Sequence, residues 1–424
     1  MRDATQFLLV LAVLGGSGAS FAAEVFVARD GMLNIDGQRT FVIGLYENPD
    51  DDAILDEVAG AGFNLVRVSA DQAALDRLHT RKLYGWINTG GRIALEDNSE
   101  AAGAALRELV AAWAGHPALL VWEVPDEILW NCMLRALRGP GTLLEKAVQF
   151  DQNAVALGQR VIAGYTLLRQ LDPQHPVWMN HAAGNSIAHL TLFGRGADIV
   201  GCDIYPVMPY PTAPLDVSRS GLAAVGVCTT RMQASAPDKP VWMVLQGMSW
   251  GDFNGIFTLQ DRPGQYPSFE ESRFMAYEAV ARGARGVLYW GTHYAAKDGA
   301  CWKNLLALAR ELADNQPLLR APDAPLKPTV ETLIFGGLPF PVKDTPIGVR
   351  ALGKHVDGQT WWIVVNEFFF PVAYVLGGLD TLEGTVYSES NSGQNATVAD
   401  GVLKGDLPRY GVHILRPEPE GKKS

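Results

Sequence analysis

Residues 118–124 read ALLVWEV, a short run in which Glu123 is the single polar residue. A strand that is apolar on both faces is typical of a parallel sheet that helices cover on both sides. Runs of the same kind recur along the chain, and helical patterns separate most of them. The predicted strands are Phe41–Tyr46, Asn64–Ser69, Leu83–Asn88, Ala118–Val124, Val177–His181, Asp198–Tyr205, Val241–Gln246 and Val287–Gly291.

Helical periodicity between and after these strands completes the alternation. The predicted helices are Asp51–Ala61, Ala70–Arg81, Glu100–Ala114, Leu143–Leu171, Leu215–Ala234, Ser268–Arg282 and Cys301–Ala313. The segment between the fifth and sixth strands gives no clear pattern. Two long connections, residues 128–142 and 247–267, are expected to be loops.

This alternation predicts an α/β fold of the closed (β/α)₈ TIM-barrel type, whose usual size is roughly 250 residues. An open, doubly wound sheet is the alternative. It is disfavoured because no GxGxxG follows the first strand and no phosphate-binding GxxxxGK[ST] occurs.

The Pro-rich stretch PDAPLKP (residues 322–328) ends the alternation. Short β-rich runs with Gly and Asn turns follow it, which predicts a smaller all-β sandwich domain. We therefore expect a signal peptide at residues 1–23, a barrel domain at 24–322 and an antiparallel β-sandwich domain at 323–424. The strands expected in the sandwich are Gly348–Leu352, Thr360–Asn366, Val372–Val375, Gly384–Glu389, Thr397–Ala399 and Gly411–Leu415.

The N-terminus has the features of an export signal. Residues Phe7–Leu14 (FLLVLAVL) are uninterruptedly apolar, but this run is too short to span a bilayer core of roughly 30 Å. Ser20 and Ala22 satisfy the small-residue rule for cleavage. We expect cleavage after Ala22 or Ala23 and a periplasmic or secreted mature protein without a membrane span. A retained N-terminal anchor is the alternative.

Charge and composition exclude several classes of function. With 35 Lys and Arg against 46 Asp and Glu, the net charge of −11 disfavours binding to nucleic acid phosphates. The hydrophobic content of 48% excludes a disordered chain. The eight histidines show no HxH or HExxH spacing, so neither a metal site nor a cofactor is predicted.

The four cysteines contain no CxxC pair. Export permits disulfides, but the sequence does not choose among the three possible pairings, and buried free thiols are an equal alternative. The oligomeric state is likewise open.

Active sites of TIM barrels gather at the C-terminal ends of the strands. Carboxylates, amides and aromatic rings occur there, a combination that suits a sugar, since hydroxyl groups need both donors and acceptors and sugar rings stack on aromatic faces. The candidate residues, in strand order, are Glu47, Arg67, Asp126, Glu127, Asn180, Asp203, Tyr205, Gln246 and Trp290.

Four of these strands resemble those of clan A glycoside hydrolases. WEVPDE (residues 122–127) resembles their fourth-strand motif, in which a Trp precedes an Asn-Glu pair and the Glu is the acid/base. GFNLVR (62–67) is similar to their second strand, PVWMVLQ (240–246) to the seventh, and LYW (288–290) to the eighth, whose Trp floors the sugar subsite. The resemblance implies a glycosidase with Glu127 as general acid. It also implies that Arg67, Tyr205, Gln246 and Trp290 orient the sugar.

Two positions depart from the pattern of that family. Asp126 stands where Asn is usual, and Gln246 stands where the retaining members place their nucleophilic Glu. An amide cannot be that nucleophile. A retaining mechanism with two carboxylates roughly 5–5.5 Å apart is therefore not expected.

Three alternatives remain. An inverting glycosidase would use Glu127 as acid and Asp203 as the first choice of base, with Glu47 and Asp252 as weaker choices. A substrate-assisted mechanism would use a 2-acetamido group steered by Asp126. The third alternative is a carbohydrate-binding barrel without catalysis. Glu127 and Asp126 also have a purely structural interpretation, as residues that begin a helix.

Overall fold

The computed structural model describes residues 23–97, 100–208, 221–253, 265–333 and 347–419. Residues 1–22 of the expected signal peptide at 1–23 and the first part of the predicted helix Leu215–Ala234 therefore lie outside the described residues. None of the helices in the described ranges combines the length and the apolar character that a bilayer crossing requires.

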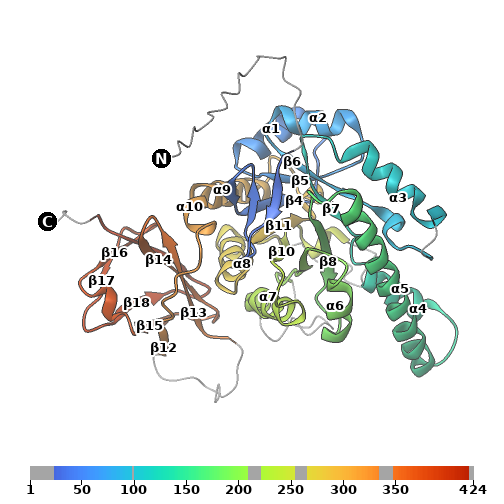
Figure 1. Cartoon of the computed structure of the whole chain (residues 1–424). Coiled ribbons are helices and arrows are strands. Elements are labelled where there is room, and N and C mark those ends of the chain that lie inside the picture. The colour runs from blue at the N-terminus through green and yellow to red at the C-terminus, as the bar shows by residue number, and fades with distance from the viewer. Residues whose placement is uncertain (1–22, 98–99, 209–220, 254–264, 334–346, 420–424) are drawn as a thin grey trace, which may run out of the picture.

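Eight parallel strands form a closed barrel, as predicted (Figure 1). The barrel closes where β11 pairs with β4, with Val287 opposite Ile43. The strands are β4 (Val42–Leu45), β5 (Leu65–Val68), β6 (Tyr84–Asn88), β7 (Leu119–Glu123), β8 (Val177–Ala182), β9 (Ile199–Asp203), β10 (Val241–Gln246) and β11 (Gly286–Trp290).

Helices cover the outside of the barrel (Figure 1). Several of them begin at side-chain caps that the sequence encodes. The longest helix, α5, starts with Thr142 and Glu145 in a reciprocal capping box, and α8 starts in the same way with Ser268 and Glu271. The helices are α1 (Asp52–Gly60), α2 (Gln72–Thr80), α3 (Glu100–Trp113), α4 (Ile128–Arg138), α5 (Leu143–Leu171), α6 (Ile187–Gly194), α7 (Ala224–Ser235), α8 (Phe269–Ala281), α9 (Ala300–Asp314) and α10 (Gln316–Leu319).

The prediction that residues 128–142 form a loop is wrong. Most of this segment is helix α4, which buries Ile128, Leu129, Cys132 and Ala136. Spacings of three and four residues place these side chains on one helix face. Helix α6 fills the segment between β8 and β9, for which the sequence gives no clear pattern.

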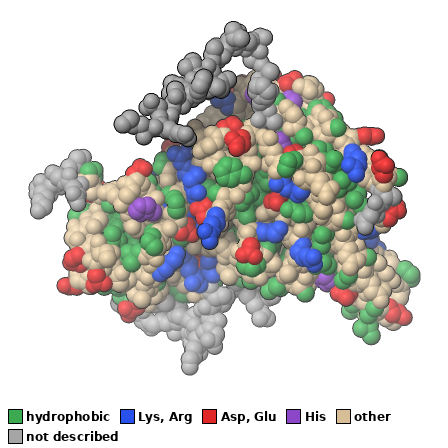
Figure 2. Space-filling view, viewed as in Figure 1, with side chains coloured by type: hydrophobic (Ala, Val, Ile, Leu, Met, Phe, Trp, Pro, Cys, Tyr) green, Lys and Arg blue, Asp and Glu red, His purple; other side chains and the backbone are tan. Residues whose placement is uncertain are grey.

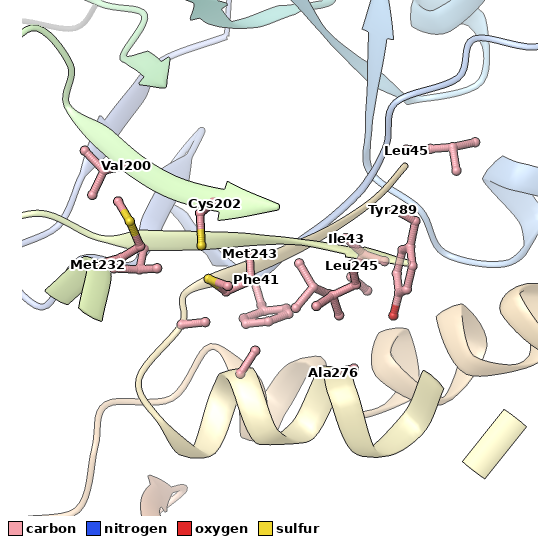
Figure 3. Packing of buried hydrophobic residues seen from close by; sticks show 14 of the residues in the cluster. Phe41, Ile43, Leu45, Val200, Cys202, Met232, Met243, Leu245, Ala276 and Tyr289 are labelled. Carbon is pink, nitrogen blue, oxygen red and sulfur yellow. The ribbon is translucent and has the colours of Figure 1, made fainter. Parts of the chain in front are cut away.

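The two faces of the barrel wall have separate cores. Outward-facing side chains of the strands, among them Ile43, Leu245 and Tyr289, pack against helix α8 at Ala276 (Figure 3). The interior is filled by bulky residues, including Trp86, Trp178 and Trp242. Gly201 permits this packing, because a Cβ atom there would lie 1.6 Å from the carbonyl oxygen of Trp242.

A small antiparallel sheet precedes the barrel. It consists of β1 (Val25–Val27), β2 (Leu33–Ile35) and β3 (Gln38–Thr40). Val25, Leu33 and Ile35 belong to the same apolar cluster as the interior barrel residues. This sheet leads directly into β4, so it packs at the N-terminal end of the barrel, opposite the mouth.

The C-terminal part consists of two antiparallel sheets, which confirms the predicted β-sandwich. Trp362, Tyr374 and Tyr387 are buried in its core. One sheet has the order β12 (Thr329–Leu333), β15 (Val372–Gly377), β18 (Leu403–Leu407), and the other β13 (Val349–Val356), β14 (Gln359–Asn366), β19 (Val412–Pro417), β16 (Val386–Glu389), β17 (Asn395–Thr397).

Strands β12 and β18 were not predicted. β12 is almost wholly exposed, and β18 carries Lys404, Gly405 and Asp406 at its centre. Neither strand therefore shows the apolar runs by which strands are recognised in a sequence.

Charged side chains join the barrel to the sandwich. Figure 2 shows Lys and Arg gathered along the seam between the two parts. Asp323 accepts from Arg285 at 2.8 Å and from Lys354 at 2.9 Å. Burial alone would raise the pKa of Asp323, but these two cations outweigh it and lower the pKa to about 2. Arg282, directly after α8, pairs with Glu367, which follows β14. The cysteines, all four in described residues, are free thiols.

Candidate active site

Two carboxyl groups meet at the C-terminal end of the barrel. Glu127 lies in the turn between β7 and α4, and Asp203 is the last residue of β9. Their side chains are hydrogen-bonded to each other. Because an ionised carboxylate has no proton to donate, this bond requires a proton on one of the two groups.

Burial raises the pKa of both carboxyl groups. It raises the pKa of Glu127 to about 7, with help from the negative charge of Asp126, while the hydrogen bond with Asp203 acts in the opposite direction. Burial, followed by the charges of Glu127 and Asp126, raises the pKa of Asp203 well above its usual range. The shared proton therefore resides on Asp203, and Asp203 donates to Glu127.

The backbone of Glu127 is in the left-handed region, with φ 45° and ψ 38°. Such a conformation costs a non-glycine residue on the order of 1–3 kcal/mol and is concentrated at functional sites. Although Glu127 precedes helix α4, its side chain makes no capping hydrogen bond. This geometry argues against the structural interpretation of Glu127 as a helix-capping residue, because the carboxyl group points to Asp203 instead.

Asp126 is held by a neighbouring strand. The amide nitrogen of Asn180, on β8, donates to Asp126 Oδ1 at 2.8 Å. The carbonyl oxygen of Asp126 accepts from the side chain of Asn131 at 3.1 Å. Asp126, Glu127 and Asp203 thus form one acidic group, and Asn180 fixes its position on one side.

A second carboxyl group lies deeper in the mouth. Glu123 is fully buried and accepts from the side-chain amide of Asn88 at 2.6 Å, while Arg67 Nε lies 3.3 Å from the same oxygen. Burial raises the pKa of Glu123 to about 7 against the opposing charge of Arg67. The Arg67 guanidinium also lies over the ring of Tyr46, 5.6 Å from its centre.

Aromatic rings line the other side of the mouth. Tyr205 stacks on Trp290, with 5.2 Å between ring centres and 21° between planes. Trp250 meets Tyr205 edge-on at 6.2 Å, and its indole nitrogen donates to the backbone oxygen of Tyr205 at 3.0 Å. Both Tyr205 and Trp290 are partly exposed, so they offer apolar faces beside the carboxyl groups.

The amide of Gln246 is engaged by the protein backbone. Its nitrogen donates to the carbonyl oxygens of Val207 at 2.8 Å and Met248 at 3.1 Å, and its oxygen accepts from the Val207 amide at 2.8 Å. Both of its N–H donors are therefore used. Gln246 joins the loop after β9 to the end of β10, and a direct contact between its amide and a sugar stays a prediction.

Two further carboxylates of the mouth have protein partners. Glu47 is paired with Lys297 at 2.6 Å and accepts from Thr292 at 2.6 Å. Asp252 accepts from the backbone of Ser249 at 2.9 Å and from the Tyr266 hydroxyl at 2.8 Å. These partners neutralise or occupy both groups, whereas Asp203 is hydrogen-bonded to Glu127 itself.

Sequence reasoning missed Lys297, which holds the Glu47 carboxylate. Asn88, which holds the Glu123 carboxylate, and Trp250, which positions Tyr205, stand at or after strand ends, where the strand-end rule places candidate site residues. In the described part of the chain, no three His, Cys, Asp or Glu side chains are placed to hold a metal ion.

Comparisons with known proteins show which fold this is. The chain resembles a β-galactosidase from Bacillus circulans sp. alkalophilus with a TM-score of 0.56 and 10% identity, covering 89% of this chain and 99% of the other. A glycoside hydrolase family 5 protein from Bacteroides vulgatus ATCC 8482 resembles the chain with a TM-score of 0.55 and 14% identity, covering 94% of this chain and 93% of the other. The chain therefore shares the TIM-barrel fold of these two solved proteins.

The chain spans only part of some solved structures. Against a β-galactosidase from the psychrophilic Marinomonas ef1, with 15% identity and a TM-score of 0.45, the chain spans 59% of the other protein's length. No family model matches the sequence. No curated protein matches it either.

Proposed function

We propose that this protein is a glycosidase that cleaves an oligo- or polysaccharide with the Glu127 and Asp203 carboxyl groups. The observation that supports it best is the hydrogen bond between these two carboxyl groups beside the partly exposed Tyr205–Trp290 pair. The two carboxyl groups together carry one proton and one negative charge, which are the acid and the base that glycoside hydrolysis needs. The fold, shared with glycoside hydrolases, agrees with this proposal.

Glu127 is the general acid in this proposal. Its pKa, raised to about 7, lies near neutral pH, which is the range that suits a group that accepts and then gives up a proton. When a sugar enters, the proton on Asp203 passes along the hydrogen bond to Glu127. Glu127 then gives it to the leaving oxygen, and the Asp203 carboxylate accepts a proton from water as the water attacks the sugar.

The mechanism requires the two side chains to separate. Inverting pairs stand roughly 6.5–9.5 Å apart to leave room for water, whereas hydrogen-bonded carboxyl groups are in direct contact. Sugar binding between them would open this space. In a substrate-assisted mechanism, Asp126, already fixed by Asn180, would instead orient a 2-acetamido group.

One observation favours a second candidate function, a carbohydrate-binding barrel without catalysis. The position that would carry the nucleophile in a retaining enzyme holds Gln246, whose amide is bonded to the backbone. Such a protein would keep the aromatic faces and the polar groups of the mouth. In either case, residues 1–23 support export to the periplasm or the medium.

A panel of oligosaccharides tests these proposals. Purified protein is incubated with each sugar, and the configuration of the newly formed product is followed by NMR. Inversion supports Asp203 as the water-activating base, and retention only with 2-acetamido sugars supports the role of Asp126. Binding without cleavage supports the non-catalytic alternative.

A further inference from the structure

A cavity of about 2030 Å³ lies between the start of α8 and the sandwich. Tyr266 and Arg273 line it from the barrel side, and Glu389, Asp406 and His413 line it from the sandwich side. Pockets for single small molecules measure roughly 300–1,000 Å³. The space is therefore large enough for an extended ligand, and it is separate from the carboxyl pair at the mouth.

Two charged residues on opposite walls are rigidly held. Arg273 is 8% exposed, pairs with Glu311 at 2.8 Å and donates to the backbone of Val412 at 3.0 Å. Glu389 is 4% exposed and accepts from the backbone amide of Ser392. Arg273 Nη2 and Glu389 Oε1 have no hydrogen-bond partner among the described residues.

The lining combines donors and acceptors of both charges. Asp406 and Glu389 would repel an anion, whereas Arg273 and Arg409 would repel a cation. A hydroxyl group both donates and accepts, so a neutral polyhydroxyl ligand can use the amides, carboxylates and guanidinium groups together. An oligosaccharide is the ligand class that fits this lining.

The wall of the cavity is bonded to the barrel mouth. The Tyr266 hydroxyl donates to Asp252 at 2.8 Å. Asp252 belongs to the short helical turn Trp250–Phe253, whose first residue donates to Tyr205 in the aromatic pair. Helices of a TIM barrel begin on the side where the strands end, so the start of α8 lies on the same side as Glu127.

We propose that this cavity binds the remote part of an oligosaccharide chain whose reacting end lies at Glu127. This proposal rests on the proposed function. It names the substrate as a longer oligosaccharide or polysaccharide rather than a disaccharide. The sandwich domain then contributes to substrate binding through Glu389, Asp406 and the neighbouring Gln394.

The test compares chain lengths by isothermal titration calorimetry on the full protein carrying Glu127→Gln, which prevents turnover. Disaccharides and hexasaccharides of the same linkages, drawn from β-galactan, β-glucan and 2-acetamido polymers, are the probes. The double variant Asp406→Ala/Gln394→Ala removes two exposed polar side chains of the lining. Lys404→Ala, an exposed residue of the same strand as Asp406 that is not part of the lining, is the matched control.

We expect a hexasaccharide to bind more tightly than its disaccharide. The double variant should weaken hexasaccharide binding about tenfold and leave disaccharide binding and the control unchanged, because two hydrogen bonds of ordinary strength are lost. Equal affinity for both lengths, or a double variant that binds the hexasaccharide normally, overturns the cavity proposal alone. If no sugar of either length binds or is cleaved, the proposed function fails as well.

Discussion

The protonated carboxyl group of Asp203 donates a hydrogen bond to the carboxylate of Glu127 across the barrel mouth. The two residues come from different strand ends, and the left-handed backbone at Glu127 turns its side chain toward Asp203. Three acidic side chains lie together here, yet Asp126 has Asn180 as a partner and Asp203 retains its proton. The site therefore stores one transferable proton close to one free charge.

The pH profile of hydrolysis should report this proton. Because the pair needs one proton and one negative charge to act as acid and base, activity should fall on the acidic side as Glu127 takes up a second proton, with an apparent pKa near the value of about 7 given for Glu127. The apparent value belongs to the coupled pair rather than to one residue. Initial rates between pH 4 and 10 measure it. Activity that stays constant from pH 9 down to pH 4 would contradict the assignment.

Removing the buried carboxyl group of Glu123 should change the pH dependence of stability. Its folded-state pKa of about 7 lies above the unfolded value of 4.5, so the folded protein holds the proton more strongly. At pH values between these two pKa values the unfolded chain binds fewer protons than the folded protein does. The free energy of unfolding therefore falls as the pH rises. The free energy of unfolding of Glu123→Gln, taken relative to that of the native protein, should therefore rise by roughly 1–3 kcal/mol from pH 4 to pH 8.

Chemical unfolding of the two proteins at both pH values measures this difference. Glu331→Gln, on the exposed strand β12, is the control. A difference between Glu123→Gln and the native protein that is the same at both pH values would show that folding does not raise the pKa of Glu123.

Arg67 should be required for the stability of the mouth. Its guanidinium is the cation paired with fully buried Glu123. Removing one partner of a buried ion pair leaves an uncompensated charge and costs about 3–5 kcal/mol. Because Arg67 is itself partly exposed, the loss for Arg67→Ala should lie at or below the lower end of this range. Thermal unfolding at pH 8, where Glu123 is largely ionised, should show a lowered midpoint, and the deficit should shrink at pH 5. An equal deficit at both pH values would point to lost packing alone.

Gln246→Glu should not create a retaining enzyme. The Gln246 amide donates to the carbonyl oxygens of Val207 and Met248, and a carboxylate would face both oxygens without a proton to donate. The substitution should cost about 2–4 kcal/mol of stability. Denaturant unfolding and NMR of the product measure both effects. A stable Gln246→Glu protein with retained product would mean that Gln246 simply replaces a nucleophile.

Much of the fold follows from local sequence patterns. The strand Val241–Gln246 was predicted with the bounds it has, because an apolar run between turn signals identifies a buried strand. Helix α4 was missed although Ile128, Leu129 and Cys132 occupy one face, since this short segment was interpreted as part of a loop. Active sites of TIM barrels lie at the C-terminal ends of the strands, which predicted that the carboxylates, the amides and the aromatic pair lie at one mouth.

The contacts within the site are not accessible in the same way. Nothing in the residue pattern predicts a positive φ at a glutamate, and the hydrogen bond with Asp203 depends on that conformation. The partners of Gln246 are backbone atoms of loops, whose positions follow from the closed barrel rather than from the identity of the neighbouring residues. The sequence thus predicted candidate site residues but not the state of their protons.

The rate of hydrolysis by Glu127→Gln and Asp203→Asn, beside the native protein, tests the central claim most directly. The measurement uses a sugar from the panel that the native protein cleaves, with circular dichroism to establish that each variant is folded. We expect each variant to lose roughly 10²–10⁴-fold in rate, because each lacks one half of the acid–base pair. Folded variants that cleave the sugar at the native rate would contradict the account and place the chemistry elsewhere in the molecule.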